Sequence, residues 1–95
     1  MNKYELGVVY RAGLDEETMK AEVERVQGFI TRFGGTIEKV DDWGRRKLAY
    51  PIEKQTDGFY SFITFMAESG VPAEVEGRIR IVESVLRYLI TRVEV

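Results

Sequence analysis

An amphipathic helix is the feature that most restricts the folds open to this chain. Its apolar side chains recur at spacings of four, three, four and three residues, at Met19, Val23, Val26, Ile30 and Phe33. This spacing places all of them on one side of a helix. Asp15 is positioned to cap the N-terminus of that helix, and Gly34-Gly35 to end it. Because an apolar helix face must pack against a second layer, the chain needs a sheet or another helix beneath it.

Four predicted strands supply that layer. Residues 4–10, 36–54, 59–66 and 85–93 are rich in β-branched and aromatic residues, and several of these segments alternate apolar with polar side chains. A short second helix is expected to begin at Pro72 and to carry Val75 and Ile79 on its apolar side. The alternation fails at Asp41–Gly44, where we expect a bulge or bend. Gln55–Gly58, which ends in Asp-Gly, reads as the turn of a β-hairpin.

The order β-α-β-β-α-β predicts an α+β, ferredoxin-like sandwich. We expect a four-stranded antiparallel sheet with strand order 4-1-3-2 and both helices on one face, as one domain over residues 1–95. Residues 59–66 are apolar on both faces of their strand. A sheet with one solvated face normally alternates apolar with polar residues. The face without helices is therefore unusually apolar, which indicates a partner surface.

Composition excludes several functions. The chain has no cysteine and no histidine, so thiolate chemistry is absent, and the commonest general base and metal ligand is missing. These absences disfavour a metal site and acid–base catalysis. Together with what the resemblance given below implies, they lead us to expect no enzymatic activity, no metal, no cofactor and no small-molecule substrate. Lacking an apolar N-terminal segment or a membrane-length run, the chain is expected to be cytoplasmic. The net charge of −2 indicates that any contact with RNA is local.

Positive charge is concentrated in two stretches. Arg45-Arg46-Lys47 follows Trp43-Gly44, and four arginines lie between residues 78 and 92. Adjacent cations on an extended segment suit a phosphate backbone, because each contact releases bound counterions. Ordinary solvated surfaces are the competing interpretation for both stretches.

A set of ordered landmarks resembles the bacterial ribosomal protein S6 family from Lys3 to about Arg92. The most specific are Trp43-Gly44-Arg45-Arg46-Lys47-Leu48-Ala49-Tyr50-Pro51-Ile52 and Gly58-Phe59-Tyr60; Lys3-Tyr4-Glu5, Gly34-Gly35, Ile81 and Val85-Leu86-Arg87 support them. The resemblance implies a cytoplasmic, ribosomal protein that binds the central domain of 16S rRNA as a heterodimer with the small basic ribosomal protein S18. Many relatives carry an acidic or disordered C-terminal extension; this chain stops at Val95, so no function of such a tail is expected.

Two sets of candidate residues follow. The predicted rRNA contacts are cations, namely Arg45, Arg46 and Lys47 first, then Arg87, Arg80 and Arg92, with Lys3 and Lys54 extending the surface. The predicted partner surface is aromatic and consists of Trp43, Tyr50, Tyr60 and Phe62. Strand alternation should send Arg87 and Arg92 to opposite faces of the sheet.

Three alternatives remain open. An RNA-recognition-motif-like module shares the element order and reads single-stranded RNA with aromatic residues of its third strand. Asp57 stands where that module has a base, and an extra residue disturbs its aromatic spacing. An acylphosphatase-like hydrolase would need a catalytic asparagine, and the only one is Asn2. The third alternative is a homodimer that pairs the apolar sheet faces.

Overall fold

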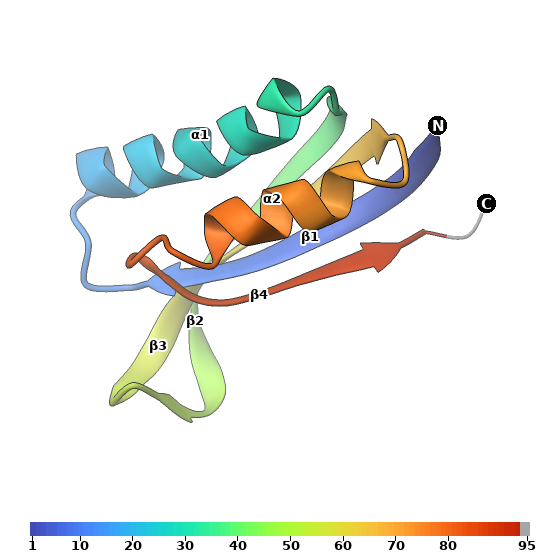
Figure 1. Cartoon of the computed structure of the whole chain (residues 1–95). Coiled ribbons are helices and arrows are strands. Elements are labelled where there is room, and N and C mark those ends of the chain that lie inside the picture. The colour runs from blue at the N-terminus through green and yellow to red at the C-terminus, as the bar shows by residue number, and fades with distance from the viewer. Residues whose placement is uncertain (94–95) are drawn as a thin grey trace.

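The computed structural model of the protein describes residues 1–93 and shows the predicted element order. The elements are β1 (Asn2–Arg11), α1 (Glu16–Arg32), β2 (Thr36–Ile52), β3 (Gln55–Ala67), α2 (Val71–Ile79) and β4 (Val85–Arg92). The strands form one antiparallel sheet in the order β2-β3-β1-β4, with both helices on the same face (Figure 1). This confirms the ferredoxin-like fold and the predicted strand order, read from the opposite edge. Within residues 1–93, no helix is long and apolar enough to cross a membrane.

The core lies between the helices and one face of the sheet. β1 alternates strictly, so that Tyr4, Leu6, Val8 and Tyr10 are buried beneath the helices. The predicted stripe of α1 meets them, with Met19, Val23, Val26 and Ile30 buried, and α2 adds Val71, Val75 and Ile79. Burying apolar side chains from both layers is the main force that holds the helices on this face.

The predicted ends of α1 are confirmed. Asp15 is the N-cap, and its Oδ1 accepts a hydrogen bond of 2.7 Å from the backbone N–H of Thr18. Hydrogen bonding to Thr18 favours the charged carboxylate and lowers the pKa of Asp15. The chain leaves the helix after Phe33 through Gly34, whose φ is +91°. That left-handed conformation is the usual way for glycine to end a helix.

The prediction of a hairpin turn at Gln55–Gly58 is wrong. These residues belong to β3, and the turn is formed by Glu53 and Lys54, with φ of 48° and 68°. Positive φ at both central positions is typical of the type I′ turn, one of the two-residue hairpin turns that match the strand twist. Gly58 instead lies in the ladder opposite Arg11 and Arg46, where a Cβ would come within 2.4 Å of Val9 Cγ1. Gly58 therefore serves close packing of β3 on β1, not a turn.

Replacing Tyr10 with Phe should stabilise the protein. Tyr10 is fully buried and packs edge-on against Phe59, and within the described residues its hydroxyl has no hydrogen-bond partner. Burial raises the pKa of Tyr10, and the charges of Asp42 and Glu22 add to the effect. Since a buried, unpaired hydroxyl costs free energy, Tyr10→Phe is expected to raise the free energy of unfolding by about 1 kcal/mol, measured by urea denaturation at neutral pH.

Tyr4→Phe is the matched control, because the Tyr4 hydroxyl accepts a hydrogen bond of 3.3 Å from Asn2 Nδ2. The Tyr4→Phe variant should show no increase in the free energy of unfolding. A Tyr10→Phe variant less stable than the wild type would show that the hydroxyl is paired in solution.

Candidate functional site on the open face of the sheet

The face of the sheet opposite the helices exposes aromatic and aliphatic side chains. Strand alternation puts Tyr60 and Phe62 of β3 on this open face, next to Val9 of β1 and Leu89 of β4. Leu89 is 64% exposed. An apolar sheet face without a covering layer was predicted from the sequence of β3, and the structure shows it.

A bulge in β2 places Trp43 on this face. Asp42 and Gly44 pair with the neighbouring residues Ser61 and Tyr60, so Trp43 is the extra residue of the bulge. Gly44 has a φ of 79°, which confirms the bend expected at Asp41–Gly44. The Trp43 ring packs on Phe62 with centroids 4.5 Å apart, and its Nε1 donates to Asp41 Oδ2 at 3.1 Å. The indole is thus held in place, while 50% of Trp43 stays exposed.

A second, larger irregularity in β2 builds the wall of a groove. Lys47 pairs with Asp57 and Ile52 with Gln55, so residues 48–51 lie opposite Thr56 alone. The surplus chain bulges over the open face, and the hairpin of β2 and β3 projects beyond the helical layer (Figure 1). Between the bulge and the sheet lies an apolar groove of about 260 Å³, lined among others by Val9, Leu48, Tyr50, Tyr60, Phe62 and Leu89.

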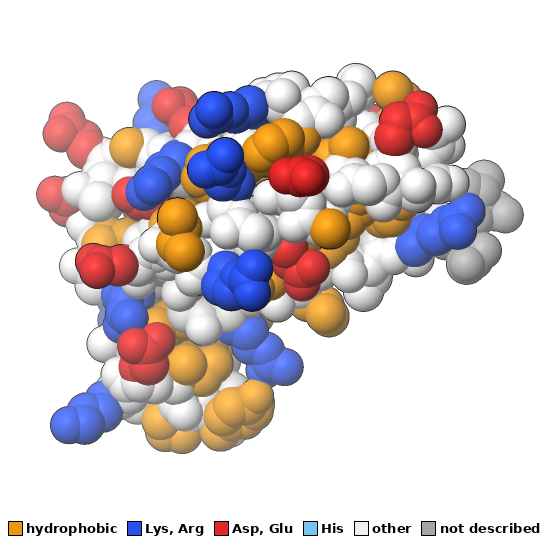
Figure 2. All heavy atoms as spheres, in the orientation of Figure 1, with side chains coloured by type: hydrophobic (Ala, Val, Ile, Leu, Met, Phe, Trp, Pro, Cys, Tyr) orange, Lys and Arg blue, Asp and Glu red, His pale blue; other side chains and the backbone are white. Residues whose placement is uncertain are grey.

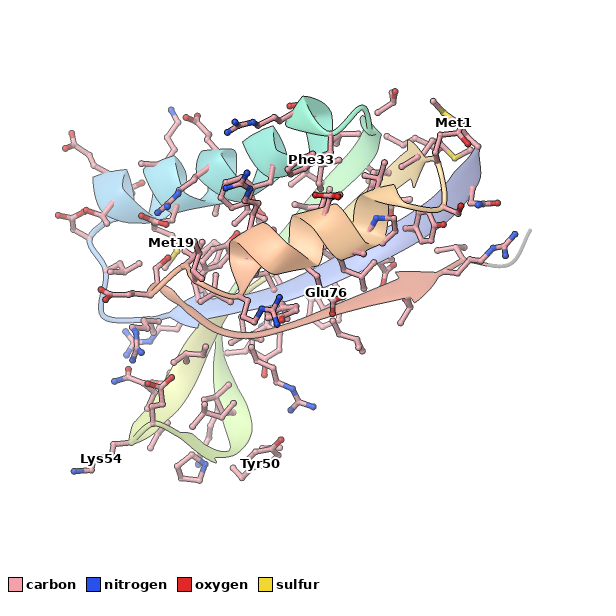
Figure 3. All side chains as sticks on the ribbon, viewed as in Figure 1. Met1, Met19, Phe33, Tyr50, Lys54 and Glu76 are labelled. Atoms are coloured by element: carbon pink, nitrogen blue, oxygen red, sulfur yellow. The ribbon has the colours of Figure 1, made fainter. Side chains whose placement is uncertain are left out.

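The predicted partner surface is brought together by this geometry. Tyr50, Tyr60 and Phe62 line the groove, and Trp43 adjoins it through its contact with Phe62. Tyr50 is 56% exposed and lies near the hairpin tip, where Lys54 also projects (Figure 3). Sequence reasoning missed Leu48 and Leu89. Leu89 could have been predicted from the sequence, because strand alternation puts it on the same face of β4 as Arg87. The position of Leu48 could not, because it depends on the bulge.

The three consecutive cations do not share one face. Alternation along β2 puts Arg46 on one side and Arg45 and Lys47 on the other, with register partners Gly58, Phe59 and Asp57 respectively. Arg45 forms an ion pair with Asp57, with Nη2 3.1 Å from Oδ2. Arg46 and Lys47 are exposed, and no ion pair is found for either within residues 1–93. Arg46 and Lys47 are therefore the more available of the three for phosphate.

The remaining predicted cations are divided between the two ends of the molecule. Arg87 lies opposite Val9, at the end of the sheet from which the hairpin projects, whereas Arg92 lies opposite Tyr4 at the other end. Lys3 accompanies Arg92 there and is 3.8 Å from Glu38, while Arg92 donates to Asn2 Oδ1 at 3.0 Å. Arg87 and Arg92 also face opposite sides of the sheet, as predicted. Lys3 lies at the start of β1 and Lys54 in the turn between β2 and β3, so the length of β1 separates the two lysines. That both extend a basic surface for rRNA stays a prediction.

The second basic stretch, residues 78–92, is likewise not one patch. Arg78 lies over the Phe33 ring, with its guanidinium 5.8 Å from the ring centroid, on the helical side of the molecule. Arg80 is exposed just after α2 and borders a polar depression with Arg11 and Glu53. Figure 2 shows orange, blue and red side chains mixed around the projecting hairpin. The hairpin end thus combines apolar surface with positive charge.

Gly58→Ala should disturb the groove and destabilise the fold. Besides the clash with Val9, a Cβ at residue 58 would lie 3.2 Å from Leu48 Cδ2 in the groove wall. Overpacking of this kind costs about 1–3 kcal/mol, which urea denaturation would measure. Gly28→Ala is the control, because a Cβ there meets nothing within 4 Å and the residue lies inside α1. That variant should be more stable by up to about 1 kcal/mol. Equal effects of the two variants would contradict close packing at Gly58.

Comparison with known proteins agrees with this fold. The profile of the family "Ribosomal protein S6" matches residues 3–92. Small ribosomal subunit protein bS6 of Clostridium novyi is 44% identical over 94 residues, which are 99% of each chain. The bS6 protein of Clostridium kluyveri is 46% identical over 94 residues, again 99% of each chain. The crystal structure of 30S ribosomal protein S6 from Thermotoga maritima superimposes with a TM-score of 0.93 at 31% identity, over 97% of this chain and 87% of that one.

These matches place the chain among the structural proteins of the small ribosomal subunit. Within that class, the chain belongs to the ribosomal protein S6 family. The family resemblance and the ribosomal, cytoplasmic location expected from the sequence are thereby confirmed.

Proposed function

We propose that this protein binds the central domain of 16S rRNA as a heterodimer with ribosomal protein S18. It acts as one domain, without enzymatic activity or a small-molecule substrate. The observation that carries the proposal is the apolar groove on the open face, with exposed Trp43 and Tyr50 beside it. Exposed aromatic side chains around an apolar pocket are typical anchors of protein interfaces.

Positive charge at the same end of the molecule supports a shared surface with RNA. Arg46, Lys47 and Lys54 lie in the hairpin, and Arg87 lies across the groove from it. The protein as a whole carries a net charge of −2. Such a protein binds RNA weakly by itself, because only a few local cations contact phosphate. A basic partner in the groove would add its own cations to those of the hairpin and so strengthen binding.

The alternative functions find less support. A recognition-motif protein offers free aromatic faces to bases, whereas the Phe62 ring packs against Trp43 with ring centroids 4.5 Å apart. An acylphosphatase-like site would need Asn2, whose side chain instead donates to the Tyr4 hydroxyl and accepts from Arg92. For the homodimer, the mass of the free protein in solution is the direct test: twice the mass of the chain would support pairing through the open face, and the mass of a single chain would exclude it.

Reconstitution from purified components tests the proposal. The protein, S18 and a transcript of the 16S central domain would be mixed in pairs and together, with binding followed by titration calorimetry. We expect a one-to-one complex of the two proteins, and tighter RNA binding by that complex than by either protein alone. Tight binding of a short single-stranded RNA by this protein alone, unaffected by S18, would favour the recognition-motif function.

A further inference from the structure

We propose that Arg11 and Arg87 are positioning residues that hold the β2–β3 hairpin at the angle at which its groove accepts the partner protein. The inference rests on the proposed function and goes beyond it, because it gives both arginines a role within the free protein. That role is separate from any contact that Arg87, which also lines the groove, makes with the partner or with RNA. It follows from how the hairpin is attached to the rest of the molecule.

The width of the groove depends on the hairpin. One wall consists of Leu48, Ala49, Tyr50 and Ile52 from the hairpin, and the other consists of β1 and β4 around Val9 and Leu89. Past the pair Arg11–Gly58, β3 has no further partner in β1, so beyond that point the hairpin is joined to the sheet only through its own ladder. A two-stranded ribbon by itself twists and bends easily. Contacts from outside the ladder must therefore set its angle.

Arg11 holds the turn of the hairpin. Its Nη2 is 2.9 Å from Glu53 Oε1, and its Nε donates to the backbone carbonyl of Glu83 at 2.9 Å. The backbone N–H of Arg11 also donates to the Ser84 carbonyl at 2.8 Å. The guanidinium is thus anchored on the α2–β4 connection and reaches from there to the tip of the hairpin. A planar guanidinium fixed by one bond is well oriented for a second one.

Arg87 holds the bulge. Its Nη1 donates to the Tyr50 hydroxyl at 2.6 Å, and its guanidinium lies 5.9 Å from the centroid of the same ring. The hairpin is therefore attached at two separate points. Arg11 of β1 holds Glu53, and Arg87 of β4 holds Tyr50. Two such attachments fix an angle, whereas one would leave the hairpin free to pivot.

These contacts are strong enough to bias the position of the hairpin but too weak to add much to the free energy of unfolding. Arg11, Glu53, Arg87 and Tyr50 are all partly or largely exposed, and exposed ion pairs contribute little to the free energy of unfolding. A contact of that strength changes a local equilibrium by roughly two- to fivefold. Its loss would let the hairpin open more often without unfolding the core.

The test uses Glu53→Gln, which removes the charge, and Tyr50→Phe, which removes the hydroxyl and keeps the ring in the groove. Glu83→Gln is the control, because Arg11 bonds the Glu83 carbonyl and not its carboxylate. Three quantities are measured for each variant: amide hydrogen exchange of residues 48–57 in the free protein, affinity for S18, and the midpoint of urea unfolding.

We expect exchange in residues 48–57 to accelerate roughly two- to fivefold in each single variant and about tenfold in the double variant. Affinity for S18 should fall by similar factors, while the urea midpoint stays at the wild-type value. Glu83→Gln should match the wild type in all three. Charge exchange, Arg11→Glu with Glu53→Arg, should recover part of the protection that either change alone removes.

Unchanged exchange in the double variant would overturn the inference, whatever the partner does. Faster exchange with unchanged affinity for S18 would also overturn it, because the hairpin angle would then not matter for binding. Absence of S18 binding by the wild type would instead overturn the proposed function, and with it the role assigned to the two arginines.

Discussion

The Leu89→Lys variant is expected to fold like the wild type and to bind S18 about a hundredfold more weakly. Leu89 is 64% exposed in the free protein, so a lysine there meets no core residue. In the proposed complex, the side chain of residue 89 would lie in the groove and be buried against the partner protein. Burying an ammonium group there, close to Arg87, is costly because it has no counter-charge.

Ile81→Lys is the matched control for Leu89→Lys. Ile81 is 71% exposed, but it lies on the connection between α2 and β4 and does not line the groove. The same change of charge and size there should leave S18 affinity within about twofold of the wild type. Urea denaturation establishes that both variants are folded, and calorimetry measures affinity. Equal losses in the two variants would show that the groove is not the site of contact.

The second large effect concerns the hairpin cations. Replacing Arg45, Arg46 and Lys47 together by Ala should reduce the affinity of the heterodimer for the 16S central domain by more than about tenfold and flatten its salt dependence. Each lost phosphate contact lowers the slope of log affinity against log salt by roughly 0.7–0.9. Because Arg45 is already paired with Asp57, we expect Arg46 and Lys47 to account for most of the change.

A triple variant on α1 provides the control for charge alone. Replacing Lys20, Arg25 and Arg32 by Ala removes the same formal charge of three from the helical side of the molecule. It should change the slope little, since long-range attraction is screened within about 10 Å at 0.1 M salt. If the hairpin variant has the slope of the wild type, the assignment of these cations to phosphate is wrong. If both triple variants reduce the slope by the same amount, net charge alone, and not the position of the cations, determines the salt dependence of RNA binding.

Much of the fold could be predicted from local patterns. The apolar stripe and the cap at Asp15 predicted the extent of α1. The alternation of β1 predicted which face of the sheet the helix covers. Failure of the alternation at Asp41–Gly44 correctly predicted the bulge there. These features depend on residues a few positions apart, which interact within one element and leave a direct trace in the sequence.

The candidate site was predictable only in its components. Trp43, Tyr50, Tyr60 and Phe62 were predicted as a partner surface, and the structure places them around one groove. That groove, which joins three of them, depends on the bulge at residues 48–51, and their contact with a partner stays a prediction. The turn was misplaced because Asp57-Gly58 is a strong local signal for one. Packing of Gly58 against Val9, a residue far away in the chain, decided otherwise.

By itself, the sequence determined the element order, the strand order and the presence of an apolar face opposite the helices. Only the tertiary structure decided which cations lie together and which residues wall the groove. The reason is physical: periodicity acts within one segment, whereas register shifts and bulges depend on how two strands pair. Contacts such as Arg11–Glu53 and Arg87–Tyr50 join residues 37 or more positions apart. Such contacts depend on how whole elements pack, and this packing positions the hairpin on which the proposed function rests.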